Sequence, residues 1–286
     1  MLRLFTDTSA NLPVAWLKRH NIAVIPFSYA IDGQNIPYPK NMDFDGEAFY
    51  HAMRRGAVVK TAMINPTTIT EYFEEALIQG DDVLYIGMSG GISGTAQAAA
   101  MAAFDLRERY PDRVIEVIDT YAASLGEGMQ VLEAAAMAEQ GKSCHEIRAY
   151  LLERRAHMCQ FFTVDDLLYL RRGGRISEAA VIVGTVLGIK PILRGDETGH
   201  IVSCGKVRGN KRAYAALADY YNTRVLNRSE RIGIAHADNP AGAERVLTLL
   251  RENGFTGECL TVCYEPVTGA HVGPGTVALF FYGTEK

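Results

Sequence analysis

The sequence predicts an α/β fold made of two α/β domains, and three observations carry this prediction. Short apolar runs alternate with longer helical patterns from the N-terminus onward. The chain has 286 residues, which is enough for two domains of roughly 150 residues each. Strands joined by crossover helices favour a largely parallel sheet. We expect a ligand cleft at the junction of the two domains.

The first half of the chain alternates strands and helices regularly. Apolar runs predict strands at 2–5, 22–29, 82–86 and 114–118. Amphipathic or alanine-rich patterns predict helices at 13–20, 95–109, 126–140 and 144–156. A further strand is expected at 159–164. We place the domain boundary near this point, with an N-terminal domain of residues 1–155 and a C-terminal domain of residues 156–286.

The second half shows the same kind of alternation. Helical patterns predict helices at 177–187, 210–226 and 241–253. Apolar runs predict strands at 190–193, 200–206, 231–236, 258–264 and 277–282. Both halves therefore have the composition of compact α/β units.

Composition and charge argue against several classes of protein. The formal net charge of −4 argues against a general nucleic-acid binder, which needs a basic excess. The apolar stretch at the N-terminus ends before Asp7 and is too short for the apolar region of a signal peptide. No run approaches the roughly 18 apolar residues of a membrane helix. We therefore expect a cytoplasmic protein. The five cysteines form no CxxC pair, so we expect reduced thiols and neither a disulfide framework nor a metal site.

A glycine-rich loop is the first candidate for ligand binding. The stretch Gly87-Met88-Ser89-Gly90-Gly91-Ile92-Ser93-Gly94-Thr95 follows an apolar strand and opens a helix. Backbone N–H groups and the helix dipole in such a loop can hold a carboxylate or phosphate, and Ser93 and Thr95 add hydroxyl donors. Alternatively, Ser93 merely caps the helix. Both common nucleotide-binding loop motifs are absent, so we expect no nucleotide cofactor and no autonomous kinase activity.

Two further polar residues are candidates for ligand binding only when they are considered together with other residues. Thr61 ends an apolar stretch shortly before Asn65-Pro66 begins a helix, and alone it is an ordinary strand-end hydroxyl. His271 precedes the tight loop Gly273-Pro274-Gly275, which could aim its ring into the interdomain cleft. A pair of Ser93 and His271 would suit an acyl hydrolase. The G-x-S-x-G elbow and an orienting acid are missing, however.

Two basic clusters contain glycine between their charges. They are Arg171-Arg172-Gly173-Gly174-Arg175 and Lys206-Val207-Arg208-Gly209. Such segments can bind a phosphate on a ligand or an acidic patch on a partner. Alternatively, they are a solvated turn and an ordinary helix start.

These motifs, in this order, resemble the DegV family. The resemblance spans nearly the whole chain, and the collinear set is much more specific than any single element. The matching segments are 6–13, Thr61 with Asn65-Pro66, 92–97, Asp119-Thr120 with 124–126, Asp166-Leu167 with 170–176, 189–192, 206–209 and 271–275.

The resemblance implies a two-domain fold that encloses one long-chain fatty acid. The carboxylate would lie at the domain junction, and the tail would fill an apolar tunnel of the C-terminal domain, for which apolar residues are plentiful at 161–162, 181–187, 189–193 and 279–281. The residues implied to hold the carboxylate are Thr61, Ser93, Gly94 and His271. Arg175 and Thr95 would lie near the head group, and Arg208 would dock a partner.

The resemblance also implies a binding subunit and not an enzyme. Such FakB-type subunits serve a bacterial fatty acid kinase whose FakA partner, a dihydroxyacetone-kinase-like protein, carries ATP and makes acyl phosphate for phospholipid synthesis. No cofactor, metal or nucleic acid is implied, and transient membrane contact is compatible with this role. Two alternatives remain open: a Ser93/His271 acyl hydrolase, and a passive lipid carrier that has no kinase partner.

Overall fold

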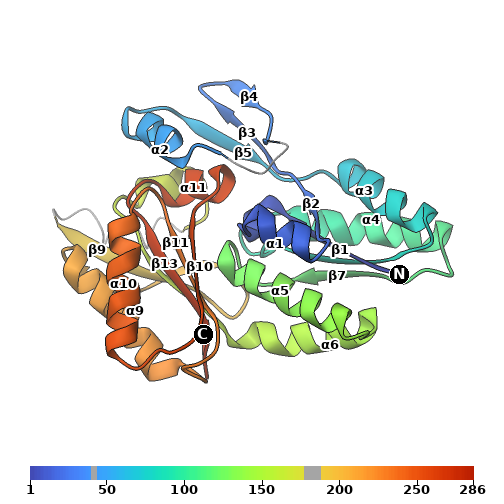
Figure 1. Cartoon of the computed structure of the whole chain (residues 1–286). Coiled ribbons are helices and arrows are strands. Elements are labelled where there is room, and N and C mark those ends of the chain that lie inside the picture. The colour runs from blue at the N-terminus through green and yellow to red at the C-terminus, as the bar shows by residue number, and fades with distance from the viewer. Residues whose placement is uncertain (40–43, 177–187) are drawn as a thin grey trace.

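A four-stranded parallel sheet forms the centre of the first half of the chain. The computed structural model describes residues 1–39, 44–176 and 188–286. The strand order is β2-β1-β6-β7, with bounds Ala23–Ile25, Leu2–Asp7, Asp82–Gly87 and Ile115–Asp119. Helices α3 (Pro66–Ile78) and α4 (Thr95–Arg109) cover one face, while α5 (Leu125–Glu139) and α6 (Cys144–Arg154) cover the other (Figure 1). Helix α1 (Val14–Arg19) connects β1 to β2.

A six-stranded mixed sheet forms the second half. Its order is β10-β9-β8-β13-β11-β12, and only the β11–β12 pair is parallel. The strand bounds are Met158–Thr163 (β8), Ile189–Gly195 (β9), Ile201–Arg208 (β10), Ile232–His236 (β11), Cys259–Cys263 (β12) and Val277–Tyr282 (β13). Helices α9 (Asn210–Arg224) and α10 (Pro240–Glu252) cover its outer face (Figure 1). Helix α5 packs on the inner face and so lies between the two large sheets.

A small antiparallel sheet links the two halves. Strands β3 (Ser28–Ile31), β4 (Gln34–Ile36) and β5 (Val59–Ala62) are arranged in the order β4-β3-β5, and α2 (Gly46–Arg54) packs beside them. This sheet extends over the short helices α7 (Leu168–Arg172) and α11 (Pro266–Val272) of the second half (Figure 1). A segment of the N-terminal half therefore forms one side of the domain junction.

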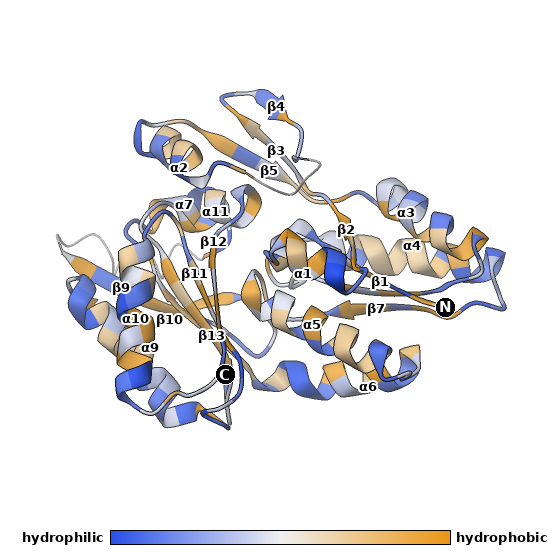
Figure 2. Ribbon diagram, in the orientation of Figure 1, coloured by the Kyte–Doolittle hydropathy of each residue, from blue (hydrophilic) through white to orange (hydrophobic). Residues whose placement is uncertain are grey.

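The hydropathy pattern explains this layering. Apolar residues concentrate on the strands and on the helix faces turned toward the sheets (Figure 2). In α5, the first eight residues from Leu125 to Leu132 are all buried, as expected for a helix packed between two sheets. Among the described residues, no helix is both long and apolar enough to cross a membrane.

Several sequence predictions need correction. The parallel sheet is correct for the first half, but four of the five strand pairings of the second half are antiparallel. His271 was expected in a loop, yet it lies in the last turn of α11, which Pro266 opens after the Glu265 cap. The predicted helix at 177–187 lies outside the described residues. The boundary between residues 155 and 156 stays our proposal.

Candidate functional site

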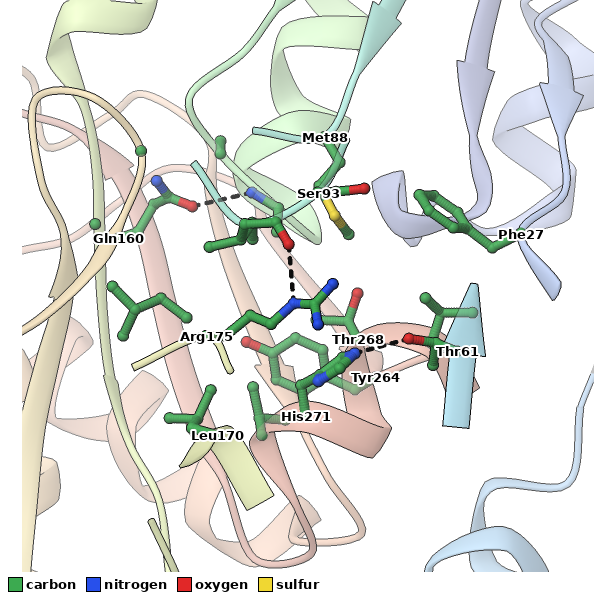
Figure 3. A pocket seen from close by; sticks show the side chains of 18 of the residues that line it. Phe27, Thr61, Met88, Ser93, Gln160, Leu170, Arg175, Tyr264, Thr268 and His271 are labelled. Carbon is green, nitrogen blue, oxygen red and sulfur yellow. Dashed lines mark hydrogen bonds between the residues drawn. The ribbon is translucent and has the colours of Figure 1, made fainter. Parts of the chain in front are cut away.

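A deep pocket lies between the two halves of the chain. It contains about 780 Å³ of empty space, part of which is open to solvent. Both halves contribute side chains to its wall, which agrees with the ligand cleft predicted at the domain junction. Figure 3 shows the pocket from close by. Its lining residues from the first half are Phe27, Thr61, Ala62, Met63, Met88, Ile92, Ser93, Ala122 and Ala123.

One end of the pocket carries a pair formed by a hydroxyl and an imidazole. The Oγ1 of Thr61, on β5, lies 2.8 Å from Nε2 of His271, on α11 (Figure 3). Burial, followed by the positive charge of Arg175, lowers the pKa of His271 to about 4. The ring is therefore neutral at pH 7, and the pair offers uncharged hydrogen-bonding groups to a ligand.

The glycine-rich loop supplies Ser93 to the same pocket. Ser93 is 8% exposed, and its Oγ lies 3.0 Å from Oγ1 of Thr95. Thr95 is fully buried, and its Oγ1 also accepts a hydrogen bond from the backbone N–H of Ile64 at 3.3 Å. Gly94 is the N-cap residue of α4. Neither Gly94 nor Thr95 lines the pocket, so Thr95 orients Ser93 and does not face a ligand.

The second half of the chain holds this loop from two sides. The Oγ of Ser89 donates to the carbonyl of Gly199 at 3.0 Å. Nε of Arg175 donates to the carbonyl of Ile92 at 2.9 Å (Figure 3). Gly91 must be glycine here, because a Cβ would come within 2.7 Å of the backbone of Gly199. The position of Ser93 therefore depends on contact between the two halves.

Arg175 lines the pocket but directs hydrogen bonds to the backbone. Besides the bond to Ile92, its Nη1 donates to the carbonyl of Gly173. Burial lowers the pKa of this guanidinium, although it remains charged at neutral pH. A positive charge is thus present near Thr61 and His271, and it has no carboxylate partner among the residues that the structure describes.

A buried carboxyl pair lies behind the glycine-rich loop. Oγ of Ser9 lies 2.5 Å from both Oδ1 of Asp7 and Oε2 of Glu127. One hydroxyl can donate only one proton, so the second short contact requires a proton on a carboxyl group. Burial and then repulsion from Asp7 raise the pKa of Glu127 well above its ordinary value. Asp7 accepts from Tyr85 and from the N–H of Met88, at 2.7 and 3.2 Å, and so fixes the start of the loop.

The inner wall of the pocket is mostly apolar. Phe162 and Phe280 line it, whereas Phe161, Leu279 and Phe281 pack in the core on the other face of the sheet. Alternate residues of a strand point to opposite faces, so only one set of each predicted apolar run can reach the pocket. Of the other runs, 189–193 contributes no lining residue, and 181–187 lies outside the described residues.

Comparison with known proteins identifies the family. A family model described as "Uncharacterised protein, DegV family" matches residues 1–284. The chain belongs to the DegV family. A DegV domain-containing protein of Clostridium perfringens is 37% identical over 286 residues, covering 99% of this chain and 98% of that protein.

Solved DegV structures share the fold and include fatty-acid-binding proteins. A DegV family protein from Thermus thermophilus, described for its fatty acid binding, matches with a TM-score of 0.87 at 30% identity, over 99% of each chain. DegV of Bacillus subtilis, described as a fatty acid binding protein, matches with a TM-score of 0.84 at 26% identity, over 98% of each chain. The predicted DegV-like α/β architecture is thereby confirmed.

The DegV fold brings four of the predicted site residues to one pocket. These are Thr61, Ser93, Arg175 and His271. Arg208 lies elsewhere, exposed on the edge strand β10 opposite Ile189. Its docking role stays a prediction. The Ser93/His271 hydrolase pair is not assembled, because Ser93 bonds to Thr95, His271 bonds to Thr61, and no described carboxylate contacts the ring.

Three polar residues of the pocket were not predicted from the sequence. Gln160 accepts from the N–H of Ala123 at 3.1 Å and donates to the carbonyl of Tyr121 at 2.9 Å. Tyr264, just after β12, and Thr268, on α11, also line the pocket. The dipeptide Glu265-Pro266 is a helix-start signal that could have located α11 and placed Thr268 one turn before His271.

Glu265 supports this part of the wall. It caps α11 by accepting from the N–H groups of Val267 and Thr268, at 2.7 and 2.5 Å. Burial raises its pKa to about 7, against the opposing effect of these donors and the nearby Thr268 hydroxyl. That hydroxyl nevertheless lacks hydrogen-bond geometry to any described residue. No cluster of three or more metal-ligating residues occurs in the described parts of the chain.

Proposed function

We propose that this DegV chain binds one long-chain fatty acid and presents its carboxylate to a separate kinase. The carboxylate would be held by Thr61, Ser93 and His271, with the tail along the apolar wall of the pocket. The observation that carries this proposal is one pocket with hydroxyl and neutral imidazole groups at one end and mostly apolar side chains elsewhere. The fatty-acid-binding relatives from Thermus thermophilus and Bacillus subtilis support it.

The tail would supply most of the binding free energy. Each methylene contributes about 0.8 kcal/mol when it leaves water. Side chains such as Phe162, Leu170 and Phe280 offer the apolar surface for this burial. The polar groups therefore need only orient the carboxylate, and their loss should affect chemistry more than affinity.

Neutral donors suit a carboxylate that must react. In the proposed step, a carboxylate oxygen bonds to the γ-phosphorus of ATP on the partner while the bond to ADP breaks. A bidentate arginine pair would stabilise the unreacted carboxylate and oppose this transfer. Two N–H groups of Arg175 already donate to backbone carbonyls, and His271 is neutral. Both features leave the carboxylate nucleophilic.

The partner would be a FakA-like, dihydroxyacetone-kinase-type protein. Lys206, Arg208, Lys211 and Arg212 are exposed, and none of them forms an ion pair with a residue in the described ranges. Unpaired cations of this kind suit an acidic surface on a partner, which they would steer toward the complex. We propose that Arg208 belongs to this docking surface.

The test is to extract lipid from protein expressed in bacteria. Mass spectrometry should find a bound fatty acid, because an apolar pocket between two domains favours an apolar occupant. Delipidated protein should melt at a lower temperature and recover on adding stearic acid, by mass action on the folded state. Methyl stearate, which has the same tail but no carboxylate, serves as the control and should restore less. Absence of acyl lipid, together with no thermal shift on adding stearic acid, would refute fatty acid binding.

A further inference from the structure

Tyr264 places a polar group in the apolar part of the pocket. The residue follows β12, is only 3% exposed, and lines the pocket. Its hydroxyl forms no hydrogen bond with any residue that the structure describes. Figure 3 shows the ring beside His271, with its hydroxyl pointing into the pocket and away from Thr61. The hydroxyl is thus directed to a different part of the pocket from the Thr61–His271 pair.

The backbone of Tyr264 is held on both sides. Its N–H donates to the carbonyl of His236 at 2.8 Å, and its own carbonyl accepts from the hydroxyl of Tyr50 at 2.8 Å. Burial raises the pKa of the Tyr264 phenol, so the group stays protonated and can donate. The direction of the ring is therefore set by the fold, and its donor is available to a ligand.

Three other buried tyrosines donate their hydroxyls to acceptors on the protein. Tyr85 donates to Asp7 at 2.7 Å, Tyr282 to Glu133 at 2.8 Å, and Tyr50 to the backbone of Tyr264. A buried polar group that is left without a partner destabilises the fold. A purely aliphatic tail would leave the Tyr264 hydroxyl in this state, and phenylalanine would line such a pocket better. The hydroxyl therefore indicates a polar feature of the ligand.

We infer that Tyr264 forms a subsite for an oxygen atom carried on the acyl chain, so that the preferred ligands are hydroxylated fatty acids. This inference rests on the proposed function and specifies its substrate class. A chain hydroxyl can both donate to and accept from the phenol. A site that offers such a bond discriminates against an analogue that lacks the hydroxyl, because the protein group is then left unpaired.

The experiment compares stearic acid with hydroxystearic acids that differ in the position of the hydroxyl. Dissociation constants are measured for delipidated wild-type protein and for Tyr264→Phe, which removes only the oxygen. The matched control is Tyr221→Phe, because the Tyr221 hydroxyl is buried without a hydrogen-bond partner among the described residues and lies in the core outside the pocket. We expect at least one hydroxystearic acid to bind wild type roughly three- to tenfold more tightly than stearic acid. This preference should vanish in Tyr264→Phe and persist in Tyr221→Phe.

Three outcomes would overturn the inference. Wild type that binds stearic acid but prefers no hydroxystearic acid has no such subsite. A preference that survives in Tyr264→Phe assigns the oxygen to another group. Equal weakening of all acids in Tyr264→Phe means that the hydroxyl contacts the carboxylate. Failure of wild type to bind any of the acids would instead refute the proposed function, and this inference with it.

Discussion

The hydroxyl of Thr61 lies 2.8 Å from Nε2 of His271, although 210 positions separate the two residues in the sequence. Thr61 is on a strand of the small sheet that extends from the N-terminal half, and His271 is on a helix of the C-terminal half. The pair therefore forms only when the two halves are in contact. A ligand group bound between them would also stabilise that contact.

Replacing Thr61 should impair presentation of the fatty acid more than its binding. Thr61→Val keeps the shape and the strand preference but removes the hydroxyl. A hydrogen bond to a charged group contributes roughly 1.5–3 kcal/mol, so we expect acyl phosphate formation with the partner kinase to fall at least about tenfold. Stearic acid affinity should change by less than about threefold, since the tail supplies most of it. Thr61→Ser, which retains the hydroxyl, is the control. Equal losses of affinity and turnover would contradict this assignment.

Gly173 offers a way to disturb His271 without changing a polar group. Its φ is −74°, so alanine fits the backbone, but a Cβ would lie 2.1 Å from Nδ1 of His271. Gly173→Ala should displace the ring from Thr61 and lower acyl phosphate formation as strongly as Thr61→Val does. The neighbouring Gly174 has φ of +70° and open space around it. Gly174→Ala should therefore reduce the melting temperature, through about 1 kcal/mol of backbone strain, and leave turnover intact. Full activity in Gly173→Ala would remove His271 from the site.

His271 should make the protein less stable in acid. Its pKa is about 4 in the folded protein and near the ordinary 6.5 when unfolded. Between these values only the unfolded state binds the proton. The stability contribution is complete above pH 6.5 and is lost as the pH falls toward 4. Urea unfolding of delipidated His271→Asn should show a flatter pH dependence in this window than wild type does. A slope in His271→Asn that is identical to that of wild type would contradict the prediction.

Glu127 should have the opposite dependence on pH. Its pKa is well above 4.5 in the folded protein, so the folded state keeps a proton that the unfolded state releases. The stability that this proton provides is complete below about pH 4.5 and is lost as the pH rises through the folded pKa. Glu127→Gln mimics the protonated acid, so its stability relative to wild type should increase with pH. Asp7→Asn should instead be destabilising by roughly 1–3 kcal/mol near neutral pH, because an amide cannot accept from all four donors that surround the carboxyl group. Burial raises the pKa of Asp7, so this difference should narrow in acid. A constant difference between Glu127→Gln and wild type from acid to alkaline pH would contradict a neutral Glu127.

Arg208 should affect the partner and not the lipid. Arg208→Ala is expected to keep stearic acid affinity and to weaken use by the kinase, with a flatter dependence of turnover on salt than wild type shows. Arg19, an exposed cation at the end of α1, provides the control, and its substitution by alanine should change neither quantity. A loss of fatty acid affinity alone in Arg208→Ala would refute the docking role.

Local sequence patterns predicted the elements that are long and regular. The helix at 95–109 has the predicted bounds, and the glycine-rich loop before it supplies Ser93 to the pocket. Such elements follow from hydrophobic period and capping residues, which act over a few positions. Helix α11 was missed because its seven residues are too few to show a helical period. The antiparallel pairings of the second sheet were missed because pairing direction depends on chain segments far away.

The sequence by itself determined the α/β class, the DegV resemblance and four residues that line the pocket. Only the tertiary structure decided that Thr61 contacts His271 and that Thr95 supports Ser93 from behind. It also decided that the Tyr264 hydroxyl has no hydrogen-bond partner within residues 1–39, 44–176 and 188–286. The same applies to Phe162 and Phe161, which are neighbours in one apolar run yet lie on opposite faces of β8. The physical reason is that a local hydrophobic pattern indicates only which residues are buried on folding. Which of them meet across the domain junction depends on how distant segments pack.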